Sequence, residues 1–120
     1  MLSKISLLGA IIFVVLLFWG GSQPVAVGLF QPPWDKVAHF TAFGMLAFML
    51  WIGFQGRWPL LIIFLVGGVG ALDEWRQTFL SGRTMSLEDF AMDLTSVVVI
   101  VGVMSIRAKL INENRDCSKE

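Results

Sequence analysis

The chain has 120 residues, of which 56% are hydrophobic and 15% are charged, and its mean hydropathy is +0.74. A soluble domain of this size cannot bury so much apolar surface, so we expect a protein that uses the membrane as its solvent. The net charge is zero and no basic run is present, which argues against a nucleic-acid partner. Cys117 is the only cysteine, so we expect neither an intramolecular disulfide nor a metal site built from thiolates.

Four apolar runs account for almost the whole chain. Each contains about 15 to 20 residues, close to the roughly 20 that an α-helix needs to cross the bilayer core. We therefore predict an all-α integral membrane protein with a single domain over residues 1–120. The predicted transmembrane helices cover residues 5–20, 37–54, 58–76 and 87–106, and a polar tail follows at 107–120.

The first run also has the form of a secretory signal peptide, because Lys4 precedes an apolar stretch. The residues after it lack a convincing small-x-small cleavage pattern, so we expect a retained first helix. The next segment, residues 21–34, is apolar, and its three prolines prevent a continuous helix. Two interpretations fit this segment: a flap along the outer membrane interface, or a loop packed on the neighbouring helices.

The basic residues predict the orientation of the helices. With both termini on one side of the membrane, that side holds six of them: Lys4, Arg57, Arg107, Lys109, Arg115 and Lys119. The other side holds only Lys36, Arg76 and Arg83, so the positive-inside rule places both termini in the cytoplasm. Tryptophans mark both interfaces, as an aromatic belt requires: Trp19, Trp34 and Trp75 outside, Trp51 and Trp58 inside.

Most of the acidic residues lie at the predicted outer edge of the membrane, together with the single histidine. Charge at this position is costly unless it is solvated, paired or used, so its concentration from three separate segments predicts a site. The set consists of Asp35, Lys36, His39, Asp73, Glu74, Arg76, Arg83, Glu88, Asp89 and Asp93.

The second predicted helix begins with two of these residues on one face. Asp35 and His39 are four positions apart, so they lie one helical turn from each other. Asp35 is placed to cap free backbone N–H groups at the helix start, which is a purely structural role. His39 lies about one turn inside the span, where a histidine acts as a proton shuttle, a metal ligand or a hydrogen-bonded contact between helices.

The third predicted helix ends with a carboxylate in an unfavourable position. Glu74 and Gln77 share one stripe of the helix. The C-terminal end of a helix dipole favours cations, so Glu74 needs a partner from elsewhere. Arg83, Lys36 and a protonated His39 are the candidates.

The fourth predicted helix begins with a capping pattern and continues with a carboxylate deeper in the span. Ser86 followed by Asp89 is a capping-box spacing, which by itself explains both residues. Asp93 lies about 6 Å further along the helix, so it must meet a donor from another helix, bind water or carry a proton. Just before the helix, Arg83 has the planar guanidinium that clamps a carboxylate or a phosphate with two parallel hydrogen bonds.

Together these side chains suit a phosphate or pyrophosphate group. Arg83 and Lys36 would hold the anion, while His39 and Glu74 would move protons. A metal ion on His39, Glu74 and one aspartate of the fourth helix is not predicted, because no close-spaced ligand motif supports it. We therefore assign no metal ligand from the sequence, and the cofactor is unknown.

The order of these motifs resembles the VanZ-like family of small multi-helix membrane proteins, named for a teicoplanin-resistance protein. The matching motifs are Asp35-Lys36-x2-His39-Phe40, Glu74-x2-Gln77, and Gly82-Arg83 with Ser86 and Asp89, within residues 35–105. The resemblance implies a shared polar set formed by Lys36, His39, Glu74, Gln77, Arg83 and Asp89. It also implies a role in the bacterial cell envelope or in glycopeptide resistance. The family usually has asparagine at the position of Asp93 and glycine soon after, where this chain has Ser96.

The favoured hypothesis is an outward-facing site in the bacterial cytoplasmic (inner) membrane that binds or modifies a phosphate-bearing envelope lipid or glycan precursor. Its candidate catalytic residues are His39 and Glu74, and its candidate substrate-binding residues are Lys36, Gln77, Arg83, Asp89 and Asp93. One alternative is a non-catalytic assembly partner of envelope enzymes, whose polar edge forms structural ion pairs. A less favoured alternative is a small proton-coupled transporter, which needs an ionisable group near the bilayer midplane. These residues leave open whether the site is enzymatic.

Overall fold

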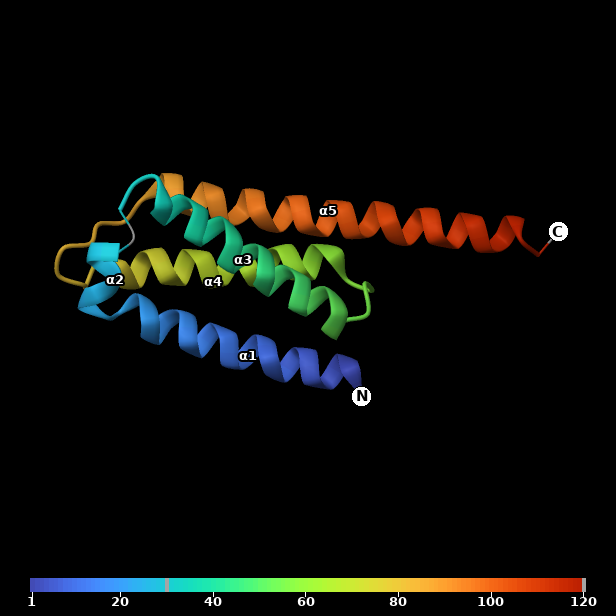
Figure 1. Cartoon of the computed structure of the whole chain (residues 1–120), viewed down its shortest axis with the longest axis horizontal. Coiled ribbons are helices and arrows are strands. Elements are labelled where there is room, and N and C mark those ends of the chain that lie inside the picture. Colours follow the sequence, from blue (N-terminus) through green and yellow to red (C-terminus); the bar gives the residue numbers. More distant parts are fainter. Residues whose placement is uncertain (30, 120) are drawn as a thin grey trace.

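The structure is a computed structural model that describes residues 1–29 and 31–119. Its described part is helical and contains no strand, which confirms the predicted all-α class. The elements are α1 (Leu2–Gly21), α2 (Pro24–Leu29), α3 (Trp34–Gly53), α4 (Pro59–Gln77) and α5 (Leu87–Cys117). Figure 1 shows the four long helices side by side, with the short α2 at one end of the bundle.

Three of these helices, α1, α3 and α5, are long and apolar enough to cross a membrane. The fourth long helix, α4, has 19 residues but carries Asp73, Glu74 and Arg76 near its end. Much of the bundle surface is apolar, including Leu60 and Phe64, which are 80% and 78% exposed. These surfaces are consistent with contact with membrane lipid.

The last helix is longer than the apolar run that predicts it. The sequence predicts a helix to residue 106 and then a polar tail, whereas α5 continues as one helix to Cys117. Residues 107–117 contain no glycine or proline and include several good helix formers, so nothing in the sequence stops the helix. These added turns are exposed and extend beyond the rest of the bundle (Figure 1).

The segment between the first two long helices contains the short helix α2. Pro24 occupies its first position, where the missing proline N–H costs nothing. After α2 the chain turns through a cis Pro32–Pro33 peptide bond into α3. Phe30, part of the predicted flap or loop, lies outside the described residues.

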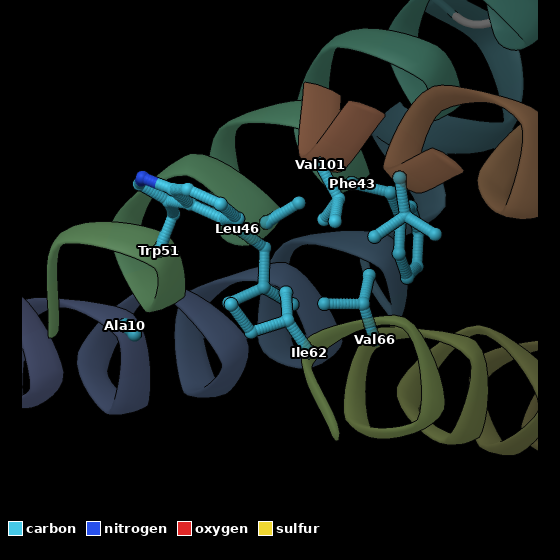
Figure 2. Packing of buried hydrophobic residues seen from close by; sticks show 9 residues of the cluster. Ala10, Phe43, Leu46, Trp51, Ile62, Val66 and Val101 are labelled. Atoms are coloured by element: carbon cyan, nitrogen blue, oxygen red, sulfur yellow. The ribbon is translucent and has the colours of Figure 1, made fainter. Parts of the chain in front are cut away.

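The apolar core lies in the middle of the bundle, where α3 packs against α1, α4 and α5. Figure 2 shows Phe43 and Leu46 of α3 meeting Ile62 and Val66 of α4 and Val101 of α5. Small residues allow the closest approaches between helices. A Cβ atom added at Gly53 would lie 2.5 Å from Leu7 Cδ2 of α1. Tight van der Waals packing of this kind holds helices together in lipid, where exclusion from water no longer drives association.

We expect Leu46→Ala to lower the free energy of unfolding by about 2 kcal/mol or more, because it opens a cavity in this packing. Leu46 is only 1% exposed. The matched control is Leu60→Ala, which shortens a side chain on the bundle surface. Unfolding titrations in mixed detergent micelles measure both changes. An equal loss in the two variants would show that the core is not packed as described.

Candidate functional site

The charged residues gather at one end of the bundle, which we call the charged end. Here α1 and α4 finish, α3 and α5 begin, and both α2 and the loop at residues 78–86 lie nearby (Figure 1). The ten residues of the predicted outer edge all lie in this region, where six are acidic, three are basic and one is the histidine. The charged end therefore carries three more acidic than basic side chains, and their hydrogen bonds and ion pairs decide what the site can do.

The end of α4 and the beginning of α5 are joined by Glu74. Ser86 caps α5, and its Oγ accepts a hydrogen bond from the Asp89 N–H over 3.2 Å, as the capping pattern predicts. The Ser86 N–H does not complete the box with Asp89 but donates to Glu74 Oε2 over 2.9 Å. Glu74 thus lies at the favourable N-terminal end of a second helix dipole. Neither Arg83 nor Lys36 bonds to it in the described part of the chain.

Asp93 contacts a side chain of another helix, which is one of the three possibilities that the sequence left open for it. Its Oδ1 lies 2.9 Å from His39 Nδ1 of α3, and the two side chains are 0% and 12% exposed. The His39 ring stacks on Phe43 at a centroid distance of 5.9 Å. With Asp93 ionised and the imidazole neutral, Nδ1 carries the proton and Nε2 is left as an acceptor. The contact thus orients the His39 ring, and in that protonation state it also selects the tautomer.

Three helices bring His39, Glu74 and Asp93 into one buried cluster. Each residue offers one potential metal-ligand atom, and these three atoms lie within 4.8 Å of one another. Glu74 Oε1 and Asp93 Oδ2 are buried and have no hydrogen-bond partner among the described residues. Gly70 of α4 makes room for the cluster, because a Cβ atom there would lie 3.0 Å from Asp93 Oδ2. From the sequence this grouping is considered but no metal is assigned to it, because its members come from three separate segments and form no close-spaced motif.

A second set of polar contacts fastens α1 to α4. Arg76 Nη2 donates to Asp73 Oδ1 over 2.7 Å, and its Nη1 donates to the Phe18 carbonyl over 2.8 Å. Nη1 also bonds to Ser22 Oγ, and the guanidinium lies over the Phe18 ring. Asp73 Oδ2 accepts from Gln77 Nε2 over 2.9 Å. Asp73 and Arg76 thus support the site structurally, although the sequence motifs do not single them out.

Two further charged residues, Lys36 and Asp35, lie in the first turn of α3. Lys36 forms an ion pair with Glu88, whose side chain is 79% exposed. Asp35 lies in the first turn of α3 and accepts a hydrogen bond from the Lys36 N–H over 2.8 Å. Asp35 therefore binds a free backbone N–H at the helix start, while Pro33 occupies the N-cap position itself.

A cavity of about 660 Å³ opens at the charged end. Of the seven predicted site residues, it is lined by Lys36, His39, Gln77, Arg83 and Asp89. The other two, Glu74 and Asp93, are absent from its lining and are only 1% exposed each. Leu16 and Leu17 of α1 form part of the wall, so α1 contributes to the cavity although its only charged residue, Lys4, lies at its other end. Gln31 and Pro32, beside α2, also line it.

These features define a class of protein: a small all-helical membrane protein with a buried polar cluster beside a cavity at one end of its bundle. The chain matches the VanZ/LLP1 family model over residues 4–108, and it belongs to that family. The resemblance predicted from the three motifs is thereby confirmed. No curated protein and no solved structure matches the chain.

We expect Arg76→Ala to lower the free energy of unfolding by about 3 kcal/mol, because it leaves the nearly buried Asp73 carboxylate without its cation. Arg57→Ala, at an exposed position between α3 and α4, is the control. The double variant Asp73→Asn/Arg76→Ala should lose less than the sum of the single losses, as residues that share one interaction do. Strict additivity in detergent unfolding titrations would contradict this assignment.

Proposed function

We propose that the cavity at the charged end binds the phosphate-bearing headgroup of an envelope lipid or glycan precursor. In this proposal the charged end faces the outer side of a bacterial cytoplasmic membrane, as the distribution of basic residues favours. The observation that carries the proposal is that the basic Arg83 and Lys36 and the apolar Leu16 and Leu17 line one cavity. The same cavity is also lined by the carboxylates Asp35, Asp73, Glu88 and Asp89, so the proposal depends on Arg83 and Lys36 to hold the anion.

The two basic residues are available to an incoming anion. Arg83 lines the cavity and forms no ion pair with any residue that the structure describes. Lys36 is paired with the exposed Glu88, and exposed ion pairs contribute little stability, so a phosphate can replace this partner. An arginine binds two phosphate oxygens at once, which gives geometric as well as electrostatic selectivity.

The apolar part of the lining favours an amphipathic ligand over a soluble one. Leu16 and Leu17 of α1 and Ala42 and Phe43 of α3 border the same cavity as the basic residues. A lipid headgroup at the membrane surface presents a phosphate next to a hydrocarbon chain. Such a ligand matches both kinds of lining, whereas free inorganic phosphate uses only the basic one.

Proton transfer in this site would begin at His39. Its side chain lines the cavity, and the hydrogen bond to Asp93 orients the ring, as a general base or acid requires. Glu74 is absent from the cavity lining and bonds to the Ser86 N–H and not to His39, so in our proposal it supports the site without touching the substrate. In this proposal His39 contacts the ligand, whereas Glu74 has a supporting role.

Binding of an envelope precursor links this site to glycopeptide susceptibility. Teicoplanin acts on the cell envelope, and the family's name associates it with resistance to this compound. A protein that binds or modifies a phosphate-bearing precursor changes the supply of material to that envelope. We therefore propose a contribution to teicoplanin resistance.

We expect the purified protein in lipid nanodiscs to bind a polyprenyl phosphate more tightly than the same polyprenol without phosphate. Arg83→Ala should weaken phosphate-lipid binding by about tenfold or more, because it removes a charge-assisted, two-pronged contact. Arg83→Lys should retain part of the affinity, and Arg57→Ala should retain all of it. Equal affinity for the two lipids, or for the wild type and Arg83→Ala, would refute the proposal.

In cells, we expect His39→Ala and Glu74→Gln to fail to restore the teicoplanin resistance of a deletion strain, because both interrupt the proton-transfer unit. The minimum inhibitory concentration measures this outcome, and membrane abundance of each variant is the control for folding. Glu74→Asp separates a proton-transfer site from a non-catalytic assembly partner. Its shorter side chain keeps the charge but withdraws from the Ser86 N–H, so we expect loss of resistance in the first case and not in the second. Full resistance with all three variants would favour a non-catalytic assembly partner instead.

A further inference from the structure

We propose that His39, Glu74 and Asp93 bind one divalent transition-metal ion, Zn²⁺ or Mn²⁺, in the buried cluster at the charged end. This inference does not rest on phosphate binding, because the three ligands form the cluster beside the cavity. It depends on the geometry of the ligand atoms, on two oxygens without partners and on the balance of charge.

The ligand atoms are close to the spacing that a single ion requires. Zinc binds nitrogen and oxygen ligands at about 2.0 to 2.2 Å, so two ligands of one ion lie at most about 4.4 Å apart. The three potential ligand atoms lie within 4.8 Å of one another, so they would have to move slightly closer to share an ion. An ion bound at His39 Nδ1 would replace the hydrogen bond of 2.9 Å between that atom and Asp93 Oδ1.

Two carboxylate oxygens in the cluster are buried without a partner. Glu74 Oε1 and Asp93 Oδ2 make no hydrogen bond to any described residue, although both side chains are 1% exposed. An unsatisfied buried polar atom costs free energy, and the cost rises when the group is charged. A third such oxygen, Asp89 Oδ1, is also buried and unpartnered at this end of the bundle. A cation would satisfy oxygens that the protein itself leaves unpaired.

The charge balance of the region also favours a cation. The charged end has three more acidic than basic residues. Its basic residues are committed elsewhere or lie in the cavity: Arg76 pairs with Asp73, Lys36 pairs with Glu88, and Arg83 lines the cavity. A bound divalent ion would offset most of this excess where the carboxylates are buried.

The donor set indicates which ions fit. Imidazole nitrogen suits zinc and other transition metals, and carboxylate oxygen suits manganese as well, whereas magnesium and calcium prefer all-oxygen sites. The surroundings also fit a metal site, since metal ligands are usually oriented by further contacts. The Ser86 N–H holds the other oxygen of Glu74, and Phe43 stacks on the His39 ring. His39 borders the cavity, which gives an ion a path to the cluster.

The test uses the full chain without a polyhistidine tag, purified in detergent, stripped with EDTA and titrated with ZnCl₂ or MnCl₂. We expect one tightly bound ion per chain by calorimetry and elemental analysis. The chain contains a single histidine, so a nitrogen coupling from imidazole in the pulsed electron paramagnetic resonance spectrum of bound Mn²⁺ must come from His39. Absence of a stoichiometric ion, or a bound ion without this coupling, would overturn the proposal.

Substitutions then separate the site from general carboxylate binding. Asp93→Asn and Glu74→Gln should each weaken ion binding by at least about tenfold, as loss of a ligand does. Glu113→Gln, which removes an exposed carboxylate from the far part of α5, is the matched control and should bind as the wild type. Equal loss in the control, or no loss in Asp93→Asn, contradicts the proposal. Arg83→Ala should keep the ion while losing the phosphate lipid, which distinguishes the two sites.

Discussion

The hydrogen bond between Glu74 and the Ser86 N–H joins the last turn of one helix to the first turn of the next. It places the Glu74 carboxylate between the ends of two helix dipoles. The C-terminal end of α4 disfavours negative charge, and the N-terminal end of α5 favours it, so the position of Glu74 is acceptable only while these two ends stay together. The loop at residues 78–86 and the register of α5 therefore depend on this contact. Through that register the bond also sets the position of Asp93, and with it the bond to His39.

Burial of such a polar group is possible because small residues let the helices approach. Gly70 faces Asp93 so closely that a Cβ atom would press against its carboxylate. Further along the bundle the same close packing is apolar, with Leu46 and Ile62 fully enclosed. The molecule thus separates into an apolar middle, suited to lipid on its outside, and one end at which charge is concentrated. Its cavity lies at the charged end and is lined by both charged and apolar residues.

The sequence predicts well whatever depends on local patterns. Apolar runs predict the four long helices, and the Ser86–Asp89 spacing predicts the cap. The depth of Asp93 indicates a group that needs a partner, water or a proton, and the structure places it beside His39. It does not predict contacts that require knowing which helix ends meet. The backbone partner of Glu74 is one example, and the clamp of Arg76 on α1 is another. The cluster of potential metal ligands is considered from the sequence but not assigned, because spacing along the chain cannot show how closely residues of three helices meet.

The length of α5 has a consequence for its position in the membrane. Its 31 residues measure about 46 Å at 1.5 Å per residue, which exceeds the roughly 30 Å hydrocarbon core of a bilayer. The helix begins beside the cavity and continues unbroken into turns that stand clear of the other helices (Figure 1). Some of its turns must therefore lie outside the hydrocarbon core, and the exposed, polar residues 107–117 are the ones suited to water. The single helix thus continues from the cavity at one end of the molecule to an aqueous extension at the other.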